Sequence, residues 1–472
     1  MLAETDYLVV GAGASGLAFA DALVANADAV EVAIVDTRPA PGGHWLNAYP
    51  FVRLHSPSSY YGVNSVPLGE DAIDLAGENA GYYERATGQE VREHFAAAAR
   101  RLAETGRVRL LPGHEYLGPD SAGERIGDLE SGAVSRLKVR RKVVDARYLE
   151  AGIPATHRPS FEVAAGARFV PVNELPAVAG EASSYTVIGS GKTAADACIW
   201  LLENGADPDR IRWVRPREAW FYDRRHFQPL AQVGASVEGL ALDAEAGAES
   251  ASLESLLERL EGCGRLLRID PSRPAAMFRG TMLSAPELQA LRGIQDVVRL
   301  GRVRRIEPDR ILLTQGEIAT VRGTVHVDCT ALGLSDAPAT PVFQPGRIVL
   351  QQVRHLSPCF NAALIGFLEA RRDDDAEKNR LSPPNPYPRS VEDWPRMTAT
   401  TWRAEGRWLR EPDLAEWIAS SRLNLLGALA DHAGEESVGR SLQRYLTNVS
   451  AATTQLVSLS RTGEQQQYST TQ

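Results

Sequence analysis

Two glycine-rich turns, each set between an apolar strand and a helix, constrain the fold of this chain more than any other feature. In the first, a strand of residues 7–10 leads into the turn Gly11–Gly16, a helix follows, and the next strand ends at Asp36. A strand, a G-x-G-x-x-G turn, a helix and a second strand that ends in an acid about 20 residues later predict a dinucleotide-binding α/β unit.

Each residue type in the first turn has a physical reason. Gly11 permits the tight turn, Gly13 lets the backbone approach a pyrophosphate, and Gly16 lets the helix pack closely against the strand. The helix N-terminus favours phosphate charge, and Asp36 can accept the hydroxyl hydrogens of an adenosine ribose. The first candidate site therefore comprises Gly11, Gly13, Ala14, Ser15, Gly16, Asp36, Thr37 and Arg38.

The same pattern recurs near residue 190. A strand of residues 185–188 precedes the second turn, a helix continues through Leu202, and a strand of residues 211–214 ends at Arg215. Alanine at the third glycine position still lets helix and strand pack closely. The second turn comprises Gly189, Ser190, Gly191, Lys192, Thr193 and Ala194.

The two units differ in charge at matched positions. Counted from the first glycine of each turn, Arg215 stands within one position of the place that Asp36 holds. An acid there would repel a 2′-phosphate, whereas Arg215 and Arg217 can bind one through charge-assisted hydrogen bonds. The alternative is that both arginines are ordinary exposed residues at a strand end. The exchange favours FAD in the first unit and NADPH in the second.

The remaining segments indicate an α/β protein with two Rossmann-like dinucleotide-binding domains, small antiparallel meanders and a helical C-terminal region. Short strands and turns alternate in residues 107–148, and residues 235–263 are rich in Ala, Glu and Leu, as in helices. Segments 142–148 and 325–332 are similar, and we interpret them as points where the chain leaves and re-enters the first domain. We predict an FAD-binding domain of residues 1–148 and 325–390, an inserted NADPH-binding domain of residues 149–324, and a helical extension of residues 391–472.

Composition argues against several classes of protein. A net charge of −9 and a pI near 5.6 do not suit a nucleic-acid binder, which needs a basic face. No apolar run approaches the roughly 18 residues of a membrane span, and no signal region precedes the first strand. None of the four cysteines forms a C-x-x-C pair, so neither a redox dithiol nor a zinc site is indicated. We therefore expect a cytoplasmic protein without metal, nucleic-acid or membrane partners.

These features together resemble the flavin-containing monooxygenases, within the wider group of flavoproteins that have two dinucleotide-binding domains. Besides both turns, the matching residues are the segment Pro41–Trp45 and the strand end Cys329–Gly333, and the resemblance spans residues 6 to about 335. It implies that Gly43, His44 and Trp45 lie beside the flavin. For His44, packing within the loop is the alternative.

The chain departs from this family in two places. The fingerprint F-x-G-x-x-x-H-x-x-x-W/Y, which normally precedes the second turn, is absent. An Asn that the family often places near the flavin is replaced by His55, which could hydrogen-bond the flavin and shuttle a proton. A buried His55 that ties a loop to the backbone is the alternative. The chain thus resembles a divergent member with altered active-site chemistry.

The resemblance implies hydride transfer from NADPH to FAD, reaction with O₂ to a C4a-(hydro)peroxyflavin, and oxygenation of a small-molecule soft nucleophile, an amine or a thioether. Two alternatives remain open. One is an NADPH-dependent flavoprotein reductase or dehydrogenase without oxygen transfer, and the other is a nucleotide-binding module without turnover. The tail, which carries Trp394, Trp402, Trp408 and Trp417, is a candidate lid or dimer contact, so the sequence also allows a homodimer.

Overall fold

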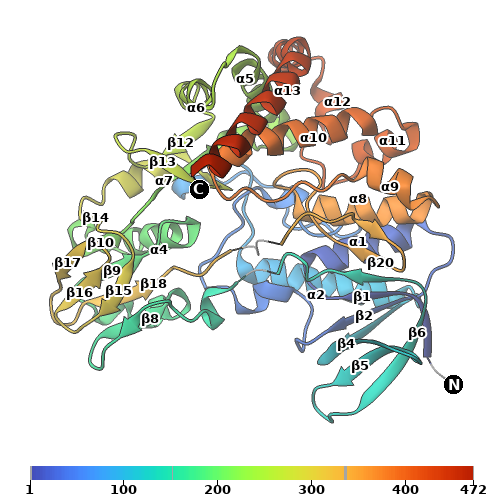
Figure 1. The fold of residues 1–472 in the computed structure, drawn as a ribbon, viewed down its shortest axis with the longest axis horizontal. Coiled ribbons are helices and arrows are strands. Elements are labelled where there is room, and N and C mark those ends of the chain that lie inside the picture. The colour runs from blue at the N-terminus through green and yellow to red at the C-terminus, as the bar shows by residue number, and fades with distance from the viewer. Residues whose placement is uncertain (1–2, 151, 334–336, 471–472) are drawn as a thin grey trace.

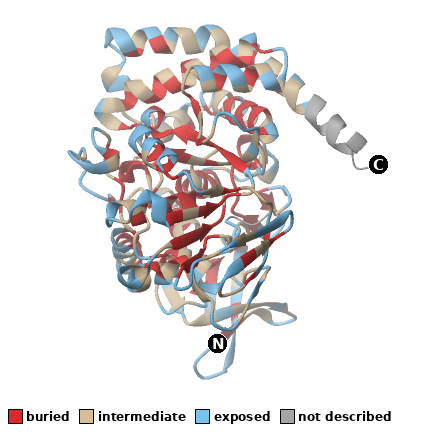
Figure 2. Ribbon diagram, turned by 90° about the vertical axis from the view of Figure 1, so that its left-hand side faces the viewer, coloured by how far each residue is buried: buried red, intermediate tan, exposed pale blue. Residues whose placement is uncertain are grey.

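Two β-sheets, one mainly and one entirely of parallel strands, form with their bordering helices the framework of the computed structural model, which describes residues 3–150, 152–333 and 337–470. The first sheet lies at the lower right of Figure 1 and the second at the left, and several C-terminal helices run across the top. Buried residues concentrate in the strands of both sheets (Figure 2). Within the described residues, no helix combines the length and apolar character needed to cross a membrane.

The first sheet contains the strands that flank the first turn. Its strands are β1 (Ala3–Val10), β2 (Val32–Asp36), β3 (Val108–Pro112), β4 (His114–Asp120), β5 (Gly123–Asp128), β6 (Val134–Asp145), β19 (Phe343–Gln344) and β20 (Arg347–Val349). The order is β19-β20-β6-β1-β2-β3, parallel from β20 to β3, while β4, β5 and β6 form an antiparallel meander. The carboxyl ends of β1 and β2 therefore lie side by side, which brings Asp36 to the first turn.

Two helices pack against this sheet, α1 (Ala14–Asn26) and α2 (Gly88–Glu104), and a third, α8 (Pro358–Arg371), packs on the outer side of α1. Helix α1 carries small and apolar residues on nearly all sides because it lies between the sheet and α8. A Cβ atom on Gly366 of α8 would stand 2.5 Å from the carbonyl oxygen of Phe19, so glycine permits this close helix contact. Helix α2 begins with a capping box between Thr87 and Glu90.

The second sheet is parallel throughout, in the order β14-β10-β9-β18-β8. These strands are β8 (Arg168–Pro171), β9 (Tyr185–Ile188), β10 (Ile211–Val214), β14 (Val297–Val298) and β18 (Val325–Asp328). Beside it lies a four-stranded sheet of β7 (Glu162–Val163), β15 (Val303–Ile306), β16 (Arg310–Leu313) and β17 (Gly316–Ala319). The associated helices are α3 (Leu175–Val178), α4 (Lys192–Glu203) and α7 (Ala285–Arg292).

The predicted domain boundary between residues 324 and 325 is wrong, because β18 belongs to the second sheet. The similarity of segments 142–148 and 325–332 has another cause: β6 lies beside β1 as β18 lies beside β9, so the two are equivalent strands of two similar units. Asp145 and Asp328 end these strands and each accepts a hydrogen bond from the backbone two residues later. The chain rejoins the first sheet at β19 and β20.

A third group of elements joins the two units. It contains a three-stranded sheet of β11 (Glu218–Asp223), β12 (Leu266–Arg268) and β13 (Ala275–Leu283). Its helices are α5 (Val233–Glu249), α6 (Leu253–Gly262), α9 (Asp375–Leu381), α10 (Trp394–Trp408), α11 (Pro412–Ser420), α12 (Leu429–His432) and α13 (Glu436–Thr470). The predicted helices of residues 235–263 and of the tail are confirmed, and α13 packs along α5. The small sheet was not predicted.

Candidate functional site

The first turn is as tight as the glycine spacing requires. Gly11 adopts a φ of +114°, and a Cβ atom on Gly16 would lie 1.9 Å from the Gly11 carbonyl oxygen. A Cβ atom on Gly43 would come within 2.9 Å of the Cα atom of Gly13, so two backbone segments touch at this point. Side chains are thereby kept away from the start of α1, where a phosphate could meet backbone N–H groups.

A cleft of about 340 Å³ opens beside this turn at the carboxyl edge of the first sheet. The predicted residues that line it are Gly11, Gly13, Ala14, Ser15, Asp36, Thr37, Arg38, Gly43 and His44. Tyr61 lines the cleft too, and sequence reasoning missed other lining residues, among them His114, Tyr116, Arg147, Leu350, Pro358 and Tyr387. Proline at the first position of α8 was an available sign that a helix begins there.

The carboxylate of Asp36 is oriented by the backbone. One oxygen accepts a hydrogen bond from the Ala12 amide at 2.7 Å, and the other accepts from the Arg38 amide at 2.8 Å. A carboxylate offers about four acceptor positions, so about two remain for ligand hydroxyls. Asp36 is thus held in place and still able to bind a ribose.

His44 and Trp45, which follow the first strand–turn–helix unit, contribute to the cleft in different ways. His44 lines the cleft, and burial, reinforced by the charge of Arg38, lowers the pKa of His44 to about 4. The indole N–H of Trp45 donates a hydrogen bond to the hydroxyl of Tyr61 at 2.9 Å. Trp45 itself is buried and acts here by orienting Tyr61, which lines the cleft.

The second turn repeats the close approach of the first. Gly189 has a φ of +144°, and a Cβ atom there would lie 2.6 Å from the carbonyl oxygen of Cys329. Gly191 is the N-cap of α4, so the amides of the first turn of this helix, including Thr193, face the end of the strand. The hydroxyl of Ser190 accepts a 3.4 Å hydrogen bond from the amide of Arg217. The turn and the strand end are therefore joined directly.

Lys192 differs from the simple expectation for a lysine in a phosphate turn. Its side chain is buried, and its ammonium group pairs with Asp196 and lies 3.6 Å from Glu287. Only its backbone amide, at the start of α4, is placed as a phosphate ligand requires. The sequence signal that was missed is the capping box Ser284–Glu287, which fixes the start of α7 and the position of the acid.

The two arginines at the second strand end lie in different environments. Arg215 is buried over the ring of Trp213 and forms a 3.0 Å ion pair with Glu218. Arg217 is exposed in part. The partial loss of hydration of its guanidinium group and the positive charges of Arg302 and Arg279 lower the pKa of Arg217. Three guanidinium groups near one another form a surface that favours an anion. Arg217 is thus better placed for a 2′-phosphate than Arg215.

His55 is half-buried and is not among the residues that line the cleft of the first turn. Burial, with the charge of Lys192, lowers the pKa of His55 to about 4, so the imidazole is neutral at physiological pH. Its carbonyl oxygen accepts a 2.9 Å hydrogen bond from Arg224. The structure therefore places the backbone of His55 against Arg224, outside the cleft of the first turn.

A buried charge cluster, formed by Arg85, Lys192, Arg224 and Glu287, surrounds this point. Glu287 lies 2.7 Å from Arg224, 3.6 Å from Lys192 and 3.7 Å from Arg85. Burial opposes its ionisation, but these three cations hold the pKa of Glu287 well below its usual value. The cluster links Arg85, just before α2, and Arg224, just after β11, to α4 and α7.

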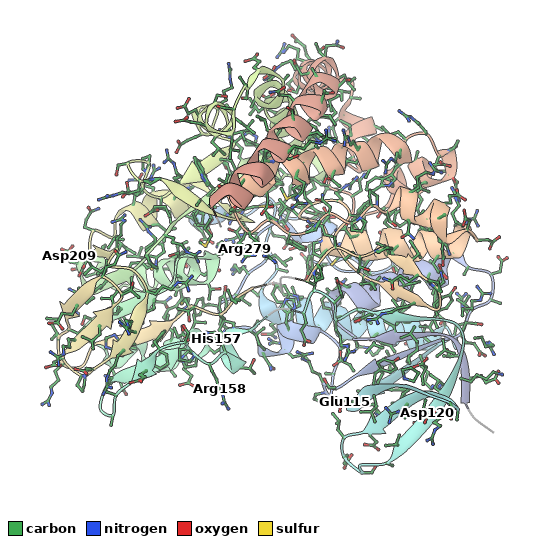
Figure 3. The ribbon with its side chains drawn as sticks, in the orientation of Figure 1. Glu115, Asp120, His157, Arg158, Asp209 and Arg279 are labelled. Atoms are coloured by element: carbon green, nitrogen blue, oxygen red, sulfur yellow. The ribbon has the colours of Figure 1, made fainter. Side chains whose placement is uncertain are left out.

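His157 follows a short 3₁₀ turn of residues Pro154–Thr156. Its Nε2 atom lies 3.1 Å from the hydroxyl of Thr330. Figure 3 shows His157 and Arg158 well apart from Glu115 and Asp120, which lie on the meander of the first unit.

Comparisons of the sequence identify related proteins. Residues 9–58 match the family of NAD(P)-binding Rossmann-like domains. The uncharacterized protein Rv2000 of Mycobacterium tuberculosis is 44% identical over 428 residues, which cover 90% of this chain and 78% of that protein. An uncharacterized protein of Mycobacterium bovis gives the same values.

Comparisons of the structure identify the fold. A polycyclic ketone monooxygenase from the thermophilic fungus Thermothelomyces thermophila aligns with a TM-score of 0.51 at 14% identity, covering 98% of this chain and 88% of that one. The structure of OTEMO in complex with FAD and NADP aligns with a TM-score of 0.50 at 15% identity, covering 78% and 83%. The predicted two-unit fold is thereby confirmed.

Proposed function

We propose that this chain, which belongs to the same protein family as Rv2000 of Mycobacterium tuberculosis, is an FAD- and NADPH-dependent monooxygenase, as its fold is similar to that of monooxygenases. The substrate that we propose is a small molecule with a soft nucleophilic nitrogen or sulfur, with O₂ as co-substrate. The contrast between the two strand ends, Asp36 beside one turn and a cluster of arginines beside the other, carries the proposal.

The residues of the first cleft fit FAD. The amides at the start of α1 can bind the pyrophosphate, and the free acceptor positions of Asp36 can bind the adenosine ribose. Helix α8 begins at Pro358 on the cleft wall, where its N-terminal dipole stabilises negative charge on a bound group. The neutral imidazole of His44 can donate or accept a hydrogen bond there without adding charge. When bound, FAD supplies hydride acceptance and the reaction with O₂.

The residues of the second turn fit NADPH. Amides of Ser190 to Thr193 at the start of α4 can bind its pyrophosphate, and a Cβ atom on the N-cap Gly191 would meet nothing within 4 Å, so the approach at that residue is open. Arg217, with Arg302 and Arg279 nearby, would hold the 2′-phosphate by charge-assisted hydrogen bonds. Arg215 is buried next to this surface, where it packs on the ring of Trp213 and forms an ion pair with Glu218.

His55 remains our candidate for the group that handles a proton at the reacting centre. Its lowered pKa keeps it neutral, so one ring nitrogen can accept a proton while the other donates a hydrogen bond. Arg224 fixes the backbone of His55, which limits the directions that the ring can take. These properties suit a side chain that accepts a proton transiently and returns it.

The proposal is tested with the purified yellow protein. Under anaerobic conditions, NADPH should bleach the flavin much faster than NADH does. Under an atmosphere of isotopically labelled O₂, incubation with a panel of amines and thioethers should yield a product that carries the label. If NADPH bleaches the flavin but all electrons are recovered as hydrogen peroxide, the protein is a reductase and oxygen transfer is refuted. Absence of bound flavin would refute both.

A further inference from the structure

A second cavity, which we name the α4 cavity, lies apart from the FAD cleft and borders the buried charge cluster. It has a volume of about 310 Å³ and shares no lining residue with the FAD cleft. The residues that line it are Pro50, Phe51, Val52, Arg53, Glu78, Arg85, Thr87, Asp196, Ile199, Trp200, Glu203, Asn204 and Glu287. It therefore lies where the segment before His55 meets α4 and α7.

One wall of the α4 cavity is aromatic. The rings of Phe51 and Trp200 are stacked, with centroids 5.1 Å apart and planes 26° from parallel. Tyr49 lies behind Phe51 at 4.9 Å, and its hydroxyl donates a 2.6 Å hydrogen bond to Asp196. Because these contacts hold the rings in place, the wall offers a rigid apolar surface to the body of a ligand.

Two carboxyl groups, those of Glu78 and Glu203, also line the α4 cavity, and Glu203 lies one turn of α4 after Trp200. Glu203 is exposed at the outer edge of the cavity, but partial burial of its carboxyl group, the hydrogen bond to Glu78 and the charge of Glu78 raise the pKa of Glu203 to about 7. Burial works against ionisation of Glu78 as well, but the hydrogen bond from Glu203 and the charge of Arg85 outweigh it and lower the pKa of Glu78. The two carboxyl groups therefore share one proton near neutral pH.

The other charges of the cavity already have partners. Asp196 pairs with Lys192, Glu287 with Arg224, and Arg85 with Glu78. Arg53, which is exposed, donates a hydrogen bond to the carbonyl oxygen of Arg85. In the described part of the chain, no lysine or arginine forms an ion pair with Glu203, so this carboxyl group is the one that gains most from an added cation.

We propose that the α4 cavity binds an organic ammonium ion with an aromatic body, whose nitrogen donates hydrogen bonds to Glu78 and Glu203 and whose body packs against Phe51 and Trp200. The ammonium takes the place of the shared proton, which leaves Glu203 and passes to solvent, while the ligand keeps its own protons. The site requires neither hydride transfer nor oxygen transfer, so it stands apart from the proposed function.

The pH dependence follows from the groups that face Glu203. These are Glu78 from the turn before Arg85, Arg85 itself, Arg53 from the preceding segment, Glu287 from α7, and Asp196 from α4. Of these, Asp196 and Glu287 are neutralised by cations, so the proton shared by Glu203 is the one that competes with the ligand near neutral pH. Binding should therefore tighten as the pH rises through about 7.

The test is calorimetric titration of the FAD-loaded protein with 2-phenylethylammonium chloride, and with 2-phenylethanol as the neutral probe. The ammonium should bind, release a proton measured from the dependence of the heat on the buffer, and bind more tightly at about pH 8 than at about pH 6. The affinity for the alcohol should be lower than that for the ammonium by at least about tenfold. Equal affinity for both probes, or no binding of the ammonium, would overturn the proposal.

Variants of Glu203 and Trp200 test separately the carboxyl groups and the aromatic rings of the cavity. Glu203→Gln should weaken ammonium binding about tenfold and abolish both the proton release and the pH dependence. Trp200→Leu should weaken it about fivefold and leave the proton release in place. Asp209→Asn, which changes an exposed carboxylate outside the cavity (Figure 3), should bind as the wild type does. Flavin content and melting temperature verify folding, and unchanged affinity in a folded Glu203→Gln protein contradicts the site.

Discussion

Replacing Glu287 by glutamine removes a negative charge that contacts three buried cations. Arg224, which has no exposed surface, would lose its 2.7 Å partner, and Lys192 and Arg85 would each lose a second one. Breaking a buried ion pair by removing one partner costs about 3–5 kcal/mol, because the remaining charge stays buried and uncompensated. Glutamine is similar in size and can still accept the hydrogen bond from the Ser284 amide, so the change isolates the charge.

The free energy of unfolding is measured by urea denaturation with tryptophan fluorescence and circular dichroism as parallel probes, since a chain of two units need not unfold in one step. Glu317→Gln provides the matched control. Glu317 is exposed on β17 and lies 4.0 Å from Arg310, so its loss should cost less than about 1 kcal/mol. A loss below about 1 kcal/mol for Glu287→Gln would refute the view that the cluster stabilises the fold.

The pH dependence gives a second check on the same residue. The pKa of Glu287 is depressed in the folded chain, so the unfolded chain binds its proton first as the pH falls. The difference in stability between wild type and Glu287→Gln should therefore be constant at neutral pH and shrink below about pH 4.5, the ordinary value for a glutamate. A difference that grows on acidification would contradict the assigned ion pairs.

Three further predictions concern the cofactor sites. Gly16→Ala should yield protein with little bound flavin, measured by visible absorbance, because the added Cβ atom would lie 1.9 Å from the Gly11 carbonyl oxygen; normal flavin content would contradict the tight turn. Arg217→Ala should raise the KM for NADPH but not for NADH by about 5- to 150-fold, the equivalent of about 1–3 kcal/mol, whereas Arg215→Ala should mainly lower the melting temperature; an unchanged NADPH preference in both would refute the 2′-phosphate site. His55 stays neutral in the folded chain, with its pKa at about 4, while the unfolded chain protonates it near 6.5. His55→Gln should therefore reduce the loss of stability between about pH 6.5 and 4, and equal losses would show that His55 is not buried as described.

The parts of the fold that local chemistry determines were predictable from the sequence. Strands β9 and β10 begin and end where the apolar runs begin and end, because both are fully surrounded in a parallel sheet. The glycines of both turns are required by backbone contacts that involve only the turn and adjacent strands. The partition of the chain was less predictable, since β18 joins the second sheet through pairings that no local pattern encodes.

The candidate site divides in the same way. Asp36 was predictable because its place at the end of β2 follows from the order of strand, turn and helix. The roles of Arg279 and Arg302 were not, because they approach Arg217 from strands and turns far along the chain. The α4 cavity likewise joins Glu78 and Glu203, residues from different units whose sequence neighbours give no sign of the contact.

Lys192 shows why a residue inside a recognised motif can have another role. The turn places its backbone amide where a phosphate binds, but α7 places Glu287 on the inner side of α4, and the ammonium group turns toward it. A lysine whose charge is used in this way cannot also neutralise a bound phosphate without leaving Glu287 with fewer partners. We therefore expect the positive charge for NADPH to come from the strand end, where Arg217 is exposed. Of the two arginines that the sequence offered for the 2′-phosphate, Arg215 and Arg217, we expect Arg217 to contact it, because Arg215 is buried in an ion pair with Glu218.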